Sequence, residues 1–71
     1  MKISDLAERL AAEYSKALSR DKVLTIHLFG IRYADQIGTA ANQVIEVSGL
    51  PKTYAVELRK AMKIAAYVTL R

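Results

Sequence analysis

Apolar residues recur at every fourth position near the start of the chain: Leu6, Leu10, Tyr14 and Leu18. Because a helix places residues i and i+4 on one face, this spacing predicts an amphipathic helix over residues 4–19. The side chain of Ser4 or Asp5 is expected to cap the N-terminus of this helix.

A nearly continuous apolar run follows, and it is interpreted as a helix over residues 21–37 with Asp21 as the N-cap. One face of this helix carries Val23, Ile26, His27, Gly30, Ala34 and Ile37, and another carries Leu24, Leu28 and Ile31. A helix that is apolar on two sides is central, or it packs on its own chain and on a second copy. Gly30 costs about 1 kcal/mol in a helix interior relative to alanine, so it indicates a close helix crossing or a break.

The same run has an alternative as a β-strand, because apolar residues alternate with Thr25 and His27. A lone strand needs a partner strand, and only a second chain could supply one here, as in ribbon-helix-helix repressors. The helix is favoured because residues 34–37 continue the helical period.

A shorter helix is expected over residues 41–48, where Val44 and Val47 lie three apart and share a face. Gly49 marks its end, since glycine accepts a positive φ without a Cβ clash. The apolar side chain of Leu50 is then expected to pack between this helix and the next.

The last predicted helix covers residues 52–69. Pro51 precedes it and suits a first helical turn, because proline fixes φ and lacks the N–H that would be unpaired there. The apolar face of this helix comprises Ala55, Leu58, Ala61 or Met62, Ala65 and Val68.

Residues 41–60 resemble the helix-turn-helix DNA-binding motif in general. The positions that carry the resemblance are Val44, Gly49, Leu50, Ala55 and Leu58. Two positions depart from it: Ile45 stands where alanine is usual and crowds the contact between the helices, and Pro51 stands where a serine or threonine N-cap is common. Periodicity and resemblance together predict an all-α bundle of about four helices that contains a helix-turn-helix.

The chain has 71 residues, so we expect a single domain over residues 1–71. It has no cysteine, and 52% of its residues are hydrophobic. So small a domain cannot easily bury that fraction, and the surplus predicts a homodimer. No apolar run is long enough for the core of a signal peptide or for a membrane span, which predicts a cytoplasmic protein without membrane contact.

The net charge of +4 is unevenly distributed. Residues 1–38 hold six basic and five acidic side chains, a balance of +1, whereas residues 39–71 hold five and two, a balance of +3. Arg59, Lys60 and Lys63 form a basic band on the last helix. The positive excess coincides with the motif, where a phosphate backbone would require it.

No pattern of residues indicates catalysis, a cofactor or a metal site. His27 is the only histidine, and its helical neighbours are apolar or glycine, so we expect a structural histidine that is hydrogen-bonded at the edge of the core. The chain has no glycine-rich phosphate loop and no cysteine nucleophile, and we therefore do not expect an enzyme.

The resemblance implies that the helix beginning near Lys52 enters the major groove of duplex DNA. The DNA-binding residues that it implies are Asn42, Gln43, Lys52, Thr53, Tyr54, Glu57, Lys60 and Lys63. The first two would donate to phosphate oxygens, and Lys60 and Lys63 would neutralise phosphates, whereas Lys52, Thr53 and Glu57 would face base edges or the nearest phosphates.

For three residues of the last helix, the sequence is compatible with two different roles or directions of the side chain. Tyr54 either reaches a phosphate or a thymine methyl group, or packs on the core beside Leu50. Glu57 either accepts from a cytosine amino group or pairs with Lys60 on the helix surface. Arg59 points either sideways or into the groove, and the sideways direction is expected.

These features predict a small DNA-binding protein, a transcriptional regulator of prokaryotic or phage type. A homodimer would bind half-sites about 34 Å apart, through an interface formed by residues 23–37 or by residues 62–70. The alternative is a helical module, such as an adaptor or an inhibitor, whose apolar surface binds another protein.

Overall fold

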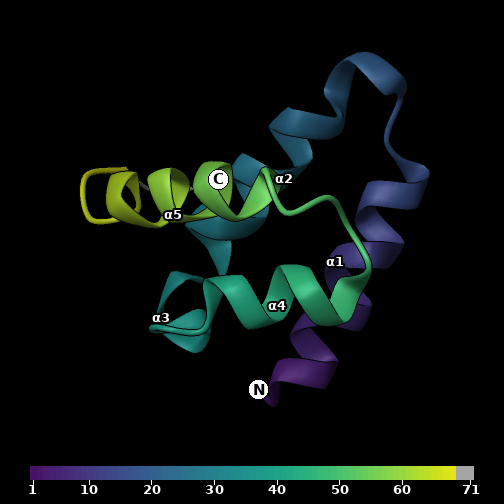
Figure 1. Ribbon diagram of the computed structural model, residues 1–71. Coiled ribbons are helices and arrows are strands. Elements are labelled where there is room, and N and C mark those ends of the chain that lie inside the picture. The colour runs from purple at the N-terminus through teal and green to yellow at the C-terminus, as the bar shows by residue number, and fades with distance from the viewer. Residues whose placement is uncertain (69–71) are drawn as a thin grey trace.

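The computed structural model describes residues 1–68, and its regular elements over these residues are all helical. The helices are α1 (Ile3–Lys16), α2 (Lys22–Arg32), α3 (Ala34–Ile37), α4 (Ala41–Ser48) and α5 (Tyr54–Ile64), with a 3-10 turn at Ser19–Asp21 (Figure 1). The predicted all-α fold is confirmed. The strand alternative for residues 23–31 is wrong, because this run forms a helix that packs along α5.

The helices form two pairs around a common core: α5 packs along α2, and α4 packs along α1 (Figure 1). All five helices contribute buried apolar side chains to this core: Leu6, Leu10, Ile26, Phe29, Ile37, Ala41, Val44, Ile45, Ala55 and Leu58. No polar or charged side chain is buried within residues 1–68. Apolar packing therefore dominates the contacts that hold the helix pairs together. None of the helices in this part of the chain is long and apolar enough to cross a membrane.

Helix α1 differs from its prediction at both ends. Its N-cap is Lys2, without a side-chain capping bond, so the expected cap by Ser4 or Asp5 is wrong. It ends at Lys16, where the backbone becomes extended at Ala17 (φ −71°, ψ 144°), and the Lys22 ammonium donates to the carbonyls of Tyr14 and Ala17 at this end, at 2.7 and 3.1 Å. Leu18 consequently lies beyond the helix and is 58% exposed instead of extending the apolar stripe.

The predicted helix over residues 21–37 is divided in two. The backbone leaves helical values at Tyr33 (φ −112°, ψ 18°), and this bend precedes α3, which brings Ile37 into the core. Asp21 precedes α2 as predicted, but its side chain makes no capping bond; its carbonyl accepts the Thr25 hydroxyl at 3.0 Å.

The buried face of α2 was only partly predicted. Ile26, Phe29 and Gly30 are buried, and Phe29, which belonged to neither predicted face, is 0% exposed. Its ring packs on Tyr33 with centroids 4.6 Å apart. Val23, which the prediction placed on the same face as Ile26 and Gly30, is exposed. On the second apolar face, Leu24 is 52% and Leu28 38% exposed, whereas Ile31 is half-buried.

In α4, Val47 does not share the buried face of Val44. Val47 is 58% exposed, and the core position next to Val44 is taken by Ile45.

The last helix is shorter than predicted. It begins at Tyr54 and ends at Ile64, and a turn over residues 65–67 follows. Tyr67 and Val68 are exposed, so the predicted apolar face does not continue to Val68. Residues 69–71 lie outside the described part of the chain.

Candidate nucleic-acid interface

Helix α4, the turn after it and α5 form the motif that the sequence predicted over residues 41–60. Gly49 adopts a left-handed conformation (φ 79°) directly after α4, and its N–H donates to the Glu46 carbonyl at 3.2 Å, which ends the helix as expected. Leu50 is half-buried against the core. The chain then enters α5 through a tight turn, in which the Tyr54 N–H donates to the Pro51 carbonyl at 3.0 Å. This lead-in turn explains why α5 starts two residues later than predicted.

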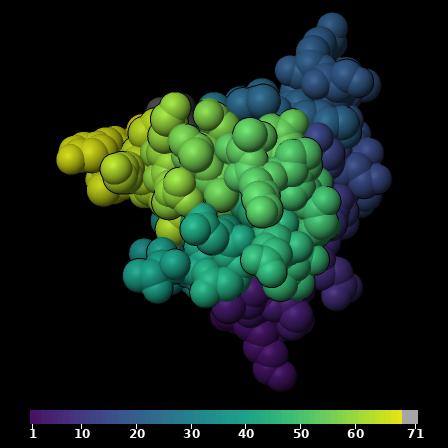
Figure 2. All heavy atoms as spheres, viewed as in Figure 1, coloured from purple at the N-terminus to yellow at the C-terminus, as the bar shows by residue number. Residues whose placement is uncertain are grey.

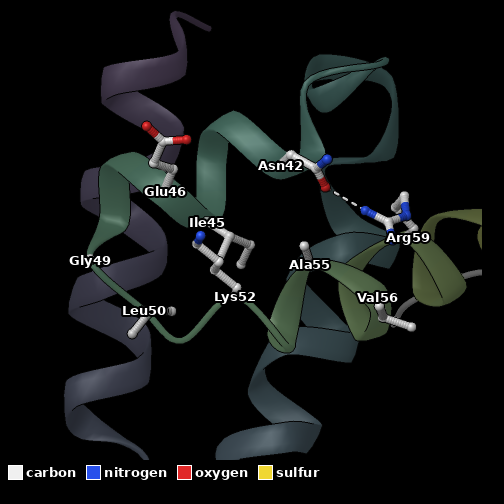
Figure 3. A pocket seen from close by; sticks show the side chains of 9 residues that line it. All are labelled: Asn42, Ile45, Glu46, Gly49, Leu50, Lys52, Ala55, Val56 and Arg59. Atoms are coloured by element: carbon white, nitrogen blue, oxygen red, sulfur yellow. Dashed lines mark hydrogen bonds between the residues drawn. The ribbon is translucent and has the colours of Figure 1, made fainter.

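The two helices of the motif run in opposite senses in Figure 1 and together cover one face of the molecule in Figure 2. Helix α5 packs mainly on α2 and α4 mainly on α1, and the direct contact between α4 and α5 is smaller. A groove of about 590 Å³ lies between these two helices on the surface. Its residues are Asn42, Ile45, Glu46, Gly49, Leu50, Lys52, Ala55, Val56 and Arg59 (Figure 3).

Ile45 is one of the residues that line this groove. The sequence placed it where helix-turn-helix motifs usually have alanine, and the structure buries it almost completely. A β-branched side chain is bulkier than alanine at this position. That Ile45 crowds the contact between α4 and α5 stays a prediction.

Arg59 and Asn42 connect the two helices across this groove. The Arg59 Nη1 donates to the Asn42 Oδ1, and both side chains are exposed (Figure 3). Arg59 was expected to point sideways from the last helix, and the structure directs it toward α4. It was absent from the predicted DNA-binding residues because of this sideways direction, and no spacing in the sequence relates residue 59 to residue 42.

Glu57 lies on the other flank of α5 and faces α2. Its Oε1 is 2.9 Å from the His27 Nε2, and its Oε2 is 3.7 Å from the Lys60 Nζ. A carboxylate accepts hydrogen bonds, so Nε2 carries the hydrogen of this contact. The hydrogen bond from His27, with a smaller contribution from Lys60, lowers the pKa of Glu57 from its ordinary value. His27 is thus a hydrogen-bonded histidine at the edge of the core, as predicted.

Tyr54 packs against α1. Its ring makes an edge-on contact with Tyr14 at a centroid distance of 5.5 Å, and the two hydroxyl oxygens are 3.1 Å apart. This hydrogen bond and burial raise the pKa of Tyr14. Of the two roles considered for Tyr54, the structure places it in the packing role, although its neighbour is Tyr14 more than Leu50.

The remaining predicted residues are exposed but do not gather at one point. Lys52 and Thr53 lie in the turn before α5, and Lys52 also lines the groove. Lys60 and Lys63 lie further along α5, and Lys63 has no ion-pair partner among residues 1–68. Gln43 is exposed on α4 but is not a groove residue, because it points to a different side of the helix from Asn42.

The structure therefore brings Asn42, Lys52 and Arg59 together around one groove, and it sets Tyr54 and Glu57 against neighbouring helices. Over residues 1–68, no group of three or more histidine, aspartate or glutamate side chains is placed to hold a metal ion.

Residues 2–71 match the protein family described as "HTH-like domain". No curated protein and no solved structure matches the chain.

Proposed function

On the premise that this chain belongs to the HTH-like domain family, we propose that it binds duplex DNA through α4 and α5 and regulates transcription. The observation that carries this proposal is the unbalanced positive charge of the α4–α5 face. Lys52, Arg59 and Lys63 are all exposed on this face, and none of them has a carboxylate partner among residues 1–68. Exposed cations along one helix match the charge of a phosphate backbone.

The contacts of Glu57 support the same proposal. A carboxylate on the DNA-facing side of α5 would repel phosphate, but this one is directed to His27 and Lys60 on the α2 side. We therefore assign Glu57 to the contact between α2 and α5 and do not give it a base-reading role. Thr53, Lys60 and Lys63 remain candidates for DNA contact, and Asn42 and Gln43 remain candidate phosphate donors on α4.

We also propose that the protein acts as a homodimer that uses the exposed face of α2. No charged residue occurs between Lys22 and Arg32, and Leu24 and Leu28 are exposed one helical turn apart. An uncharged apolar stripe is complementary to a second copy of itself around a two-fold axis. Because this stripe lies on α2, while the basic face lies on α4 and α5, one molecule can use both surfaces at once.

The test of DNA binding is fluorescence anisotropy with a mixed-sequence duplex over a range of salt concentrations. We expect the wild-type affinity to fall with salt with a log–log slope of about −0.9 per phosphate neutralised. The double variant Lys52→Ala, Lys63→Ala should bind more weakly, and its slope should be smaller by about 1 per lysine, with folding intact.

The matched control is the double variant Lys2→Ala, Lys16→Ala, which removes the same charge from exposed positions on or next to α1. It should leave the slope close to the wild-type value if the α4–α5 face is the binding surface. An equal loss of DNA affinity in both double variants would mean that only the net charge of the protein determines binding. A folded wild type that binds no duplex at low salt would contradict the proposal.

A protein-binding adaptor or inhibitor is the second candidate function, and the exposed Leu24 and Leu28 are the observation that favours it. In that case the lysine variants would retain partner binding, whereas substitutions on the α2 stripe would abolish it.

A further inference from the structure

The hydrogen bond between Arg59 and Asn42 determines which polar atoms this pair can offer to a ligand. A guanidinium group has donors only, so the asparagine must turn its Oδ1 toward Arg59. The amide Nδ2 is then left as a donor, and the guanidinium keeps its other N–H groups. The pair therefore presents donors and a positive charge, and its one strong acceptor is already used.

The surroundings of the pair also favour an anion. It lies where the groove between α4 and α5 is open to solvent. Helix α4 has no side-chain cap and no acidic residue in its first turn, so the positive end of its dipole beside Asn42 is not neutralised. Glu46 lines the same groove but forms no ion pair with Arg59 within the described residues.

We propose that Arg59 and Asn42 form a clamp for one phosphate of the DNA backbone, held between α4 and α5; this inference rests on the proposed DNA binding. An acceptor-only group with two oxygens suits the planar fork of Arg59, which can donate to Asn42 and to a phosphate together. A lysine has no such fork.

The position of Arg59 on α5 points to the backbone and not to a base. Successive helical residues are rotated by about 100°, and Leu58 points into the core, so Arg59 lies on the flank of α5 that faces α4. Val56, Lys60 and Lys63 lie closer to the outermost side. When a helix enters the major groove, its outermost side faces the base edges and its flanks face the sugar–phosphate walls.

The clamp can be tested on a duplex selected from a random library by the wild-type protein. Each phosphate of this duplex is replaced in turn by an uncharged methylphosphonate, and binding is measured for the wild type, Arg59→Ala, Arg59→Lys and Asn42→Ala. Lys63→Ala is the matched control, because it removes an exposed cation of the same helix that has no bond to α4. Urea unfolding of every variant separates lost binding from lost folding.

We expect one phosphate per half-site at which the methylphosphonate weakens wild-type binding by roughly tenfold or more, as for a charge-assisted hydrogen bond. The same replacement should cost Arg59→Ala almost nothing, whereas Lys63→Ala should remain sensitive to it. Arg59→Lys should bind several-fold more weakly than the wild type although its charge is unchanged, and Asn42→Ala should also bind more weakly.

Three results would overturn the clamp. A scan in which every replacement costs Arg59→Ala as much as the wild type would show that Arg59 contacts no single phosphate. A changed base preference in Arg59→Ala, with all phosphate effects retained, would show that the pair reads a base. Arg59→Lys binding as tightly as the wild type would reduce the role of Arg59 to its charge. A wild type that selects and binds no duplex would instead contradict the proposed function itself.

Discussion

Gly30 permits a close contact between two helices. It lies in α2 where this helix crosses α5, and a Cβ built on it would be 2.8 Å from the Ala61 Cβ and 3.0 Å from the Leu58 carbonyl oxygen. The first distance is too short for two carbon atoms, and the second involves backbone, which cannot turn aside. The crossing therefore depends on the absence of a side chain at this position.

We expect Gly30→Ala to destabilise the protein by about 1–3 kcal/mol, as other overpacked cores do. Helix propensity alone would give the opposite sign, because alanine is favoured over glycine by about 1 kcal/mol in a helix interior. The free energy of unfolding from urea denaturation measures the sign directly. The double variant Gly30→Ala, Ala61→Gly should recover part of the loss, and a more stable single variant would show that the two helices can separate at no cost.

At the scale of the elements, the pairing of α2 with α5 has a polar contact at its solvent edge. His27 on α2 and Glu57 on α5 are joined at 2.9 Å, next to the apolar contact at Gly30. Because this contact lowers the pKa of Glu57, the folded state binds a proton there less readily than the unfolded chain does. The stabilisation is therefore complete above the ordinary glutamate pKa of 4.5 and is lost as the pH falls through the lower folded value.

The expected result is that wild-type stability declines below about pH 4.5 more steeply than the stability of Glu57→Gln. Thermal or urea unfolding from pH 7 to pH 3 gives the two profiles. Glu46→Gln serves as the control, since Glu46 is exposed on α4 and has no ion-pair partner in residues 1–68, and its profile should follow the wild type. Parallel profiles for Glu57→Gln and the wild type would mean that the contact with His27 does not stabilise the folded chain.

The whole molecule carries two different surfaces on different helices. The α4–α5 face holds the groove and the exposed cations, whereas the outer side of α2 holds exposed leucines on a helix without charges between Lys22 and Arg32. A regulator that binds a two-fold symmetric site needs such a division, because the dimer contact must leave the DNA-binding surface free.

We expect Leu24→Glu or Leu28→Glu to convert a dimer into a monomer, because two copies of the new carboxylate would be buried close together at the two-fold interface. Sedimentation equilibrium measures the change. Val47→Glu is the matched control, since Val47 is also an exposed apolar residue but lies on α4. A wild type that is monomeric at all concentrations would contradict the proposed homodimer. The exposed leucines of α2 would then favour the alternative function of binding another protein.

The sequence by itself determined the helical class, the position of the turn at Gly49, and the buried faces of α1 and α5 except at their predicted C-terminal ends, where Leu18 and Val68 are exposed. These features depend on local physics: the helical period of apolar residues, the backbone freedom of glycine and the spacing of Ala55 and Leu58. The sequence also indicated a close crossing at Gly30, because glycine is costly in a helix unless packing requires it.

Only the tertiary structure decided which apolar residues are buried where several compete. Phe29 enters the core and Val47 does not, because burial depends on the direction from which α1, α4 and α5 approach each helix. The same holds for polar contacts between distant segments. His27 meets Glu57, Tyr54 meets Tyr14 and Arg59 meets Asn42 across 30, 40 and 17 residues. No local period encodes these pairs, because they arise from the packing of whole helices.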